Sequence, residues 1–410
     1  MKQREYPTCI VTNRAAGGLH AGHPWLYESD LRQAPRGAQA GDIVDVLSPR
    51  GKYLGSGFFS PASKIRIRVF SQNANDTFDA AFWQRRVRYA LAYRKAVLHC
   101  PADFSACRLI FGEADQFPGL TVDRFGDVLV AQVSSVGMER YKDCIFSALV
   151  QQLRAQGEEI HHLYERNDAA VRRAEGLEQR CGFWCGEGLT NGNGIVGIEE
   201  NGIRYTVDYI IGQKTGFFLD QKYNRAAVAH LARGRRVLDC FTHTGAFALN
   251  AVRGGAEHVT AVDISADAME QTRHNAALNG MTEQMEFVTA DVFAYLEQPQ
   301  TQAKKGAYDF IILDPPAFTK SQSTIESAFR GYLQINTAAM RLVQRGGLLA
   351  SCSCSHFMTQ ENFEQMLREA AYDAGVHLRL IEQRAQAPDH PILFGVPQTE
   401  YLKFYLFQVV

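Results

Sequence analysis

The sequence contains no long hydrophobic run, and this absence argues against a chain that spans a membrane. No stretch of about 18 consecutive apolar residues occurs in it. The first residues are polar, and the apolar segment Cys9–Val11 is too short for the core of a secretory signal. We therefore expect no transmembrane helix, no membrane partner and a cytoplasmic location.

The cysteines do not form a recognisable set of pairs. Their number, nine, is odd, and they are scattered along the chain, mostly within apolar runs. This pattern favours reduced thiols over a disulfide framework. Cys181 and Cys185 lie near His161 and His162 in the sequence, but no second cysteine pair follows. Zinc is the alternative at this place, and we expect half-buried thiols and no metal.

Neither sign of charge is in excess. The chain has 43 Lys and Arg against 44 Asp and Glu, which gives a formal net charge of −1. Binding to nucleic acid therefore requires a local concentration of positive charge. The hydrophobic content of 46% and the length of 410 residues are those of a soluble globular protein of two or three domains.

Residues 1–75 predict a small β-barrel domain. The region is rich in glycine and in short β-like segments, which are 42–46, 53–58 and 64–70. In the last of these, Lys64, Arg66 and Arg68 alternate with apolar residues and fall on one face of the strand. We expect this face to contact the phosphates of RNA, and an ordinary solvated face is the alternative.

Residues 76–190 predict a central α+β domain without catalytic residues of its own. It begins with a helix over 82–95 that is basic and contains interleaved aromatic residues. Such a helix can follow a nucleic-acid backbone, although an amphipathic packing helix is the interpretation that we favour. Two strands flank a turn at 123–127, and a helix around 142–155 follows.

Residues 191–410 predict a doubly wound α/β domain. A hairpin at about 194–208, with Asn201-Gly202 in its turn, leads into alternating short apolar strands and helices. This alternation indicates a buried parallel sheet, and ligands of such sheets bind beyond the carboxyl ends of the strands. The expected strands are 236–241, 258–263, 285–290, 308–313 and 347–352.

An acidic residue stands at the end of each of the first three strands. These residues are Asp239, Asp263 and Asp291, and they suit the ribose hydroxyls and the adenine amino group of a nucleoside. The loop after the first strand has a single glycine, Gly245, which disfavours a dinucleotide pyrophosphate. S-adenosylmethionine (SAM) fits better, and simple helix capping by the three acids is the alternative.

The fourth and fifth strands end in residues suited to methyl transfer. Asp314 opens the stiff loop Asp314–Phe318, where Phe318 can stack on a base that has left its helix. The fifth strand runs into the segment Ser351–His356, which contains the thiols of Cys352 and Cys354. Addition of a thiolate to carbon 6 of a pyrimidine makes carbon 5 nucleophilic toward a methyl donor. A cysteine at the end of a buried strand can also be a core residue.

These features and several short motifs together resemble the class I RNA (cytosine-5) methyltransferases that carry an N-terminal PUA domain and modify large-subunit ribosomal RNA. The resemblance spans essentially the whole chain. The motifs are Gly22–Trp25, Gly212–Gln221, Leu238–Phe241, Asp314–Phe318, Cys354–His356, Asp389–Pro391 and Tyr401–Lys403.

The resemblance implies a PUA-like barrel, a central domain and a Rossmann-like catalytic domain. It also implies that Cys354, rather than Cys352, is the nucleophile and that segment 214–221 lines the cofactor pocket. The fourth-strand loop lacks the second cysteine of many such enzymes. The expected cofactor residues are Phe218, Gln221, Asp239, Phe241, Gly245, Asp263, Ile264, Asp291, Val292 and Asp314. The expected substrate residues are Pro315, Pro316 and Phe318, with Lys64, Arg66 and Arg68.

The sequence thus predicts transfer of a methyl group from SAM to carbon 5 of a cytosine in RNA, specifically 23S ribosomal RNA, through an adduct on Cys354, with Asp314 as the second catalytic residue. One alternative is methylation of an exocyclic amine of adenine or guanine. The other is a non-catalytic RNA-binding assembly factor. Whether the chain forms a homodimer stays an open question.

Overall fold

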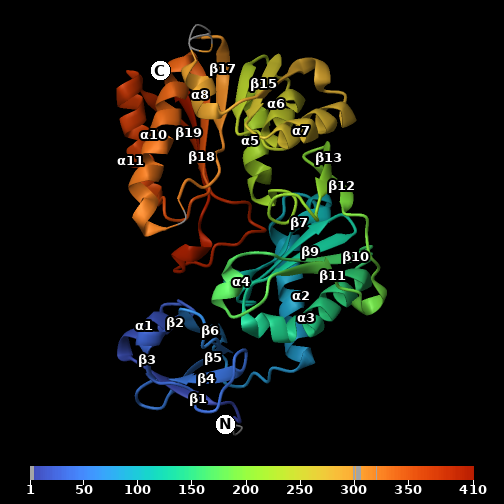
Figure 1. Cartoon of the computed structure of the whole chain (residues 1–410), viewed down its shortest axis with the longest axis vertical. Helices are drawn as coiled ribbons and strands as arrows, with labels where there is room; N and C mark the ends of the chain where they lie inside the picture. The colour runs from blue at the N-terminus through green and yellow to red at the C-terminus, as the bar shows by residue number, and fades with distance from the viewer. Residues whose placement is uncertain (1–3, 299–300, 302–305, 320) are drawn as a thin grey trace. The chain divides into compact units, whose positions relative to one another are not determined.

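A computed structural model describes residues 4–298, 301, 306–319 and 321–410. The chain forms two compact units, and each of them is assembled from several segments (Figure 1). Unit 1 consists of Met1–Ile198, Thr206–Leu219 and Pro388–Thr399. Unit 2 consists of Glu199–Tyr205, Asp220–Ala387 and Glu400–Val410.

The first part of unit 1 is a six-stranded sheet in the order β2-β6-β5-β4-β1-β3. A small apolar core, which includes Val11, Leu26, Val44 and Ile67, lies inside it. Gly57 lets two strands approach closely, because a Cβ there would lie 2.6 Å from the carbonyl oxygen of Arg68. The elements are β1 (Thr8–Val11), α1 (Asn13–His20), β2 (Trp25–Tyr27), β3 (Leu31–Gln33), β4 (Ile43–Leu47), β5 (Tyr53–Phe59) and β6 (Ile65–Ser71).

The three basic side chains around β6 do not form the shared solvated face that the alternation suggested. Arg68 is buried, and its guanidinium forms ion pairs with Glu113 and Glu175, each at 3.1 Å. Arg66 is half-buried and pairs with Glu28. Only Lys64 of the three is exposed. The expectation of a phosphate contact is therefore wrong for Arg68, because carboxylates from the following part of unit 1 pack over that end of the strand.

The second part of unit 1 is a five-stranded sheet in the order β11-β10-β9-β8-β7. Two long helices, α2 and α3, pack against each other and share one apolar core with the strands. Each helix begins at a side-chain cap: Asp79 accepts from the amide of Phe82, and Ser135 accepts from that of Met138. The elements are α2 (Ala80–Val97), β7 (Ala106–Phe111), β8 (Leu120–Phe125), β9 (Val128–Val133), α3 (Val136–Ala155), β10 (His162–Asn167), α4 (Val171–Ala174) and β11 (Arg180–Phe183).

The predicted hairpin is present as β12 (Ile195–Glu200) and β13 (Ile203–Asp208). Its turn residues Asn201 and Gly202 have φ angles of 54° and 72°. Positive φ at both central residues matches the right-handed twist of the flanking strands, which explains the Asn-Gly sequence at this place.

Unit 2 contains the predicted Rossmann-like α/β fold. Its seven-stranded sheet has the order β16-β15-β14-β17-β18-β20-β19, with the first five strands parallel and β20 antiparallel to both of its neighbours. The reversal of strand order at β14 and β17 creates a switch point, where ligands of such sheets bind. The strands are β14 (Arg236–Cys240), β15 (His258–Asp263), β16 (Met285–Thr289), β17 (Tyr308–Leu313), β18 (Val343–Ser353), β19 (Leu378–Arg384) and β20 (Lys403–Val409).

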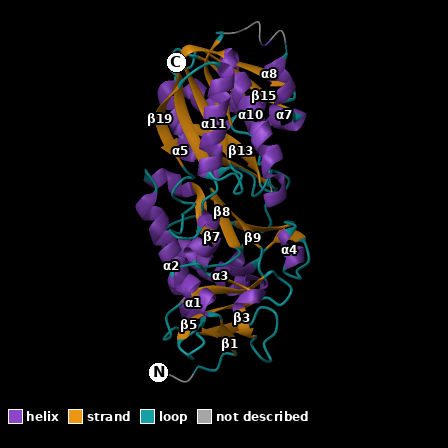
Figure 2. Cartoon of the chain, turned by 90° about the vertical axis from the view of Figure 1, so that its left-hand side faces the viewer, coloured by secondary structure: helices purple, strands orange, loops and turns teal. Residues whose placement is uncertain are grey.

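Helices cover both faces of this sheet, as the apolar sequences of its parallel strands require. Figures 1 and 2 show α8, α10 and α11 gathered on one side, and Figure 1 shows α5, α6 and α7 on the other. Strands β19 and β20 and the two segments that return to unit 1 were not predicted. The helices are α5 (Lys222–Leu231), α6 (Ala246–Arg253), α7 (Ala266–Leu278), α8 (Val292–Glu297), α10 (Ile325–Leu342) and α11 (Gln360–Ala374).

A buried ion pair joins the hairpin turn of unit 2 to helix α5. Arg225 donates from Nε and Nη2 to the two carboxylate oxygens of Glu200 at 2.7 and 2.8 Å. Both side chains are almost completely inaccessible, at 2% and 0% exposure. Removing one member of such a pair leaves the other charge buried without compensation.

We predict that Arg225→Met lowers the opening free energy of the unit 2 sheet by about 3–5 kcal/mol, because Glu200 stays buried. The matched change is Arg384→Met, at the more exposed ion pair of Arg384 with Glu382. It is expected to lower the same opening free energy by at most about 1 kcal/mol. Hydrogen exchange of the β14 and β17 amides measures both values. Equal effects of the two changes would contradict this ranking.

Candidate functional site

Asp239 is the next-to-last residue of β14, and its side chain is completely buried. Its Oδ2 accepts hydrogen bonds from Thr242 Oγ1 at 2.6 Å and from the amide of Ala248 at 3.0 Å. Its Oδ1 has no hydrogen-bond partner in the described part of the chain. Burial, together with the charges of Asp314 and Asp263, raises the pKa of Asp239 to about 7.

The loop after Asp239 is held in an unusual backbone conformation. Phe241 and His243 have φ angles of 63° and 52°, a region that side chains other than glycine rarely adopt. Gly245 has φ 80°, and a Cβ there would lie 2.6 Å from Thr272 Cγ2. Thr272 donates to the carbonyl of His243 at 2.8 Å, which helps to fix the loop. Strained and over-determined loops of this kind are typical of ligand sites.

Asp263 and Asp291 differ in what their carboxylates do. Asp263 ends β15, is half-buried, and accepts from the amides of His243 and Ser265, both at 2.9 Å. The next residue, Ile264, is 68% exposed. Asp291 is exposed and caps α8 through the amide of Ala294. Helix capping, the alternative role considered for the three acids, therefore applies to Asp291, whose Oδ1 accepts the hydrogen bond from Ala294.

Val292 does not present its side chain to a ligand. It is 2% exposed and belongs to the apolar core of unit 2. Only its backbone could contact a cofactor, and the expected role of Val292 stays a prediction.

Asp314 directly follows β17, and a short chain of amide groups positions it. Gln221 Nε2 donates to Asp314 Oδ1 at 3.0 Å, and Gln221 Oε1 accepts from Asn224 Nδ2 at 2.6 Å. Burial and the charge of Asp220 raise the pKa of Asp314 to about 7, while Arg225 acts in the opposite direction. Both protonation states of Asp314 are therefore populated near neutral pH.

Asp220 is a site residue that the sequence did not single out. Its Oδ2 accepts from the hydroxyl of Tyr401 at 2.6 Å, and its carbonyl accepts from the amide of Ala387 at 2.8 Å. Its Oδ1 is buried without a partner among the described residues. Asp220 and Tyr401 both lie in motifs that carried the family resemblance, which was the one available signal.

The structure brings Cys354 next to the loop that begins at Asp314. Cys354 is half-buried and stands one residue beyond β18, and its Sγ lies 3.9 Å from the carbonyl oxygen of Pro315. Cys352 lies inside the strand and has no exposed surface. Pro315 is buried and Pro316 is exposed.

Tyr332 and Lys403 fix the segment that carries the thiol. Ser353 Oγ donates to Tyr332 Oη at 3.0 Å, and Ser355 Oγ lies 3.2 Å from the same oxygen. The buried ammonium of Lys403 donates to the carbonyls of Ser355 and Tyr401 at 2.6 and 2.8 Å. Burial raises the pKa of Cys354 to about 12, Asp314 adds to this, and Lys403 opposes it.

Phe318 packs within an aromatic cluster. Its ring centroid lies 4.6 Å from that of Tyr332, 5.7 Å from Phe293 and 6.3 Å from Phe241. It is half-buried, so part of its surface stays accessible. The role expected for Phe318 in stacking on a base stays a prediction.

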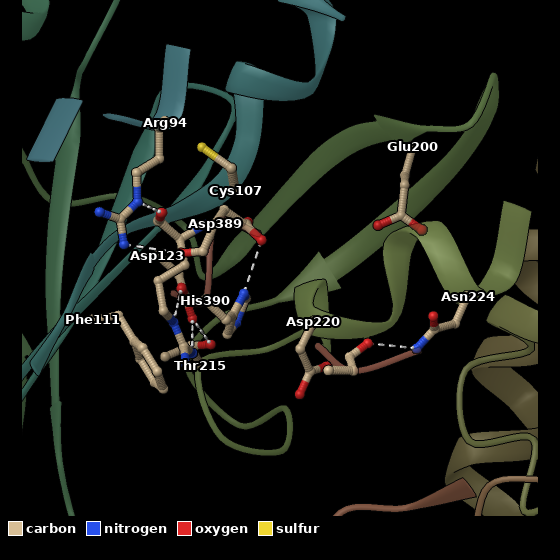
Figure 3. A network of polar contacts seen from close by, with 12 residues as sticks. Arg94, Cys107, Phe111, Asp123, Glu200, Thr215, Asp220, Asn224, Asp389 and His390 are labelled. Atoms are coloured by element: carbon tan, nitrogen blue, oxygen red, sulfur yellow. Dashed lines mark hydrogen bonds and ion pairs between the residues drawn. The ribbon is translucent and has the colours of Figure 1, made fainter. Parts of the chain in front are cut away.

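The segment 214–221, expected to line the cofactor pocket, divides between the two units. In unit 1 the hydroxyl of buried Thr215 donates to Asp123 at 2.6 Å, within a polar network that also includes Arg94 and Asp389 (Figure 3). Thr215 therefore stabilises unit 1. Phe218, also in unit 1, is half-buried.

The carboxylates of unit 2 fit a cationic ligand such as SAM. Asp239 and Asp220 each hold a buried oxygen without a hydrogen-bond partner in the described chain, and Asp314 is charge-coupled to both. Arg225, which lowers the pKa of Asp314, is engaged by both oxygens of Glu200. SAM carries a sulfonium, an ammonium and a carboxylate, so its net charge is positive, and the expected contact of exposed Ile264 with the cofactor stays a prediction.

Two other classes of site find no support in the residues described. Among them, no group of three or more His, Cys, Asp or Glu side chains is placed to hold a metal ion. No helix in the same part of the chain has the length and apolarity needed to cross a membrane.

Comparison with known proteins assigns a PUA-like domain near the N-terminus and a methyltransferase domain in the C-terminal half of the chain. Residues 10–72 match the PUA-like domain family, and residues 169–408 match the S-adenosylmethionine-dependent methyltransferases. A solved structure from Streptococcus mutans, assigned as a SAM-dependent methyltransferase, has a TM-score of 0.81 at 22% identity, over 98% of this chain and 100% of that one. A methyltransferase solved in complex with SAH has a TM-score of 0.82 at 22% identity and the same coverage.

Two relatives are similar over almost their whole length. The "Ribosomal RNA large subunit methyltransferase I" of Alteromonas mediterranea is 39% identical over 386 residues, which is 94% of each chain. The protein of the same name from Klebsiella pneumoniae (strain 342) is 38% identical over 406 residues, which is 99% of each chain. The chain belongs to the S-adenosylmethionine-dependent methyltransferase family and carries a PUA-like domain at its N-terminal end.

Proposed function

We propose that this enzyme methylates carbon 5 of a cytosine in large-subunit ribosomal RNA through a covalent adduct on Cys354. The observation that carries the proposal is the half-buried thiol beside the Asp314–Pro315 loop. The RNA class follows from the names of relatives that are 38–39% identical over nearly the entire chain. When bound, SAM supplies a methyl group made electrophilic by its sulfonium.

Cys354 and Asp314 act together in the first step. The thiol proton passes to ionised Asp314, and Sγ forms a bond to carbon 6 of the cytosine. The displaced electron pair moves through the ring to nitrogen 3, which takes the proton from Asp314. A group with a pKa of about 7 suits both transfers, because proton donors and acceptors work best near the operating pH.

Later steps regenerate the thiol. Carbon 5, now nucleophilic, forms its bond to the methyl group, and it then loses its proton to a base. The Sγ–carbon 6 bond breaks and nitrogen 3 returns its proton. Lys403 supports the departing thiolate, since its positive charge lowers the pKa of Cys354. The Asp314–Phe318 loop contains no cysteine that could act as that base.

The rigid surroundings of the thiol support a role in positioning it. Hydrogen bonds between Tyr332 and both neighbouring serines limit the movement of the segment on which Cys354 stands. A nucleophile must approach its carbon along a narrow range of directions, and a fixed backbone reduces the entropy lost on reaching it.

Covalent trapping tests this proposal directly. Large-subunit ribosomal RNA transcribed with 5-fluorocytidine should form a stable adduct with the enzyme in the presence of SAM, because fluorine blocks the loss of the carbon 5 substituent. We predict that Cys354→Ala abolishes the adduct, detected by denaturing electrophoresis. Cys352→Ala, two residues away inside β18, is the matched control and should still form it.

Two outcomes would reject the adduct. One is an unchanged rate of methyl transfer by Cys354→Ala. The other is methylation of an exocyclic amine of adenine or guanine, for which the thiol would have no chemical use.

The raised pKa values of Asp239 and Asp314 also predict how SAM binding depends on pH. Both carboxyls lie near pKa 7 without the ligand, so each is largely protonated below that pH. A cationic ligand favours the ionised forms and must release protons to bind in acid. The same two groups also make the stability of the fold depend on pH. Because the pKa of each carboxyl is higher in the folded chain than in the unfolded chain, the free energy of unfolding decreases as pH rises from about 4, the ordinary aspartate value, through about 7.

We therefore predict that the affinity for SAM falls from pH 7.5 to pH 5.5, by up to about tenfold per pH unit for each proton released. S-adenosylhomocysteine lacks the sulfonium charge and should show a smaller dependence. Titration calorimetry in buffers of different ionisation enthalpy measures the affinity and the protons released. Identical pH dependence for the two ligands would contradict a carboxylate-stabilised sulfonium.

A further inference from the structure

Helix α2 in unit 1 is strongly basic and takes no part in the site described above. Its 18 residues, Ala80–Val97, contain five basic side chains and no acidic one. The basic residues are Arg85, Arg86, Arg88, Arg94 and Lys95.

Three of the five basic side chains have structural roles. Arg94 has no exposed surface and pairs with Asp115. Arg86 is half-buried and donates to the carbonyl of Phe70 at 3.1 Å. Arg85 pairs with Asp76 at 3.1 Å. These ion pairs and hydrogen bonds account for three of the basic side chains. Arg88 and Lys95 form no such contacts with the described part of the chain.

Arg88 and Lys95 remain exposed on α2. They are seven residues apart, which is about two helical turns, so they lie on one side of the helix. In the described chain each cation contacts an aromatic ring, Arg88 that of Tyr89 at 5.7 Å and Lys95 that of Phe104 at 4.8 Å. No ion pair to a carboxylate is found for either among the described residues.

Two tyrosines flank this row of positive charge. Tyr89 and Tyr93 are four residues apart, so they are neighbours on the helix surface, and they are 56% and 38% exposed. The exposed alanines Ala92 and Ala96 lie between the charged and the aromatic rows. Figure 2 shows α2 at the margin of unit 1 with α3 beside it.

Helix α11 in unit 2 shows that exposed cations and tyrosines without neighbouring acids are not a general feature of the helices in this chain. It also exposes an arginine and a tyrosine four residues apart, Arg368 and Tyr372. There, however, Glu364 pairs with the arginine, and the helix contains four acidic residues against one basic residue. Exposed cations and aromatic rings without acids are the combination by which proteins bind single-stranded nucleic acids.

We propose that the exposed face of α2, formed by Arg88, Tyr89, Tyr93 and Lys95, binds a single-stranded segment of RNA. Arg88 and Lys95 contact phosphates, and the two tyrosines stack on bases. The proposal rests on the proposed function in one respect, that the substrate is RNA. A single-stranded segment fits because its bases are free to stack.

Equilibrium binding of fluorescein-labelled single-stranded RNA of mixed sequence, followed by anisotropy over a series of KCl concentrations, tests this surface in the full-length protein. The double variant Arg88→Gln/Lys95→Gln should reduce the slope of log K against log [KCl] by about 1.4, at about 0.7 for each phosphate contact. The double variant Tyr89→Ala/Tyr93→Ala should weaken binding at least about fivefold at every salt concentration with little change of slope.

The matched control is Arg368→Gln/Tyr372→Ala on α11, which should bind the RNA as the unaltered protein does. Wild-type affinity and slope in both α2 variants would overturn the proposal and would leave the face to another partner, such as an acidic protein. The measurement needs no catalysis. A loss of binding in the α2 variants therefore supports this surface even if no adduct forms on Cys354, and adduct formation without that loss rejects the surface alone.

Discussion

Mutual repulsion among three carboxylates of unit 2, of which Asp239 is completely buried and Asp220 and Asp314 are half-buried, is the constraint on which the proposed site depends. Asp239, Asp220 and Asp314 are coupled by charge, and oxygens of the first two have no hydrogen-bond partner in the described chain. Such a cluster is unfavourable until a cation neutralises it. In the proposed site a sulfonium nucleoside supplies that charge, so the same repulsion that weakens the free protein would favour the ligand that carries the methyl group.

The fold places the second reactant of the proposed chemistry beside this cluster. Because β17 and β18 are adjacent and parallel, the residues that follow them, Asp314 and Cys354, emerge at the same edge. Tyr332 and Lys403 then hold the segment around Cys354 through its neighbours' side chains and carbonyl groups. Cys354 is therefore positioned by elements from three separate parts of the sequence.

Much of this arrangement follows from local sequence. Alternating apolar strands and helices predicted the α/β fold, and the Asn-Gly turn is present in the hairpin. The acids at strand ends were found because parallel strands bring their ends together. Asp220, Tyr332 and Lys403 could not be assigned roles, since their partners are distant in sequence. Arg68 was misjudged for the same reason: alternation along a strand shows which face a side chain occupies but not that Glu113 and Glu175 cover that face.

The most direct test of the central claim is to map modified nucleotides by mass spectrometry in large-subunit ribosomal RNA from cells that lack this protein. The account predicts the loss of one 5-methylcytidine, restored by the unaltered gene and not by one that encodes Cys354→Ala. Loss of a methylated adenine or guanine instead, or restoration by the Cys354→Ala enzyme, would contradict it.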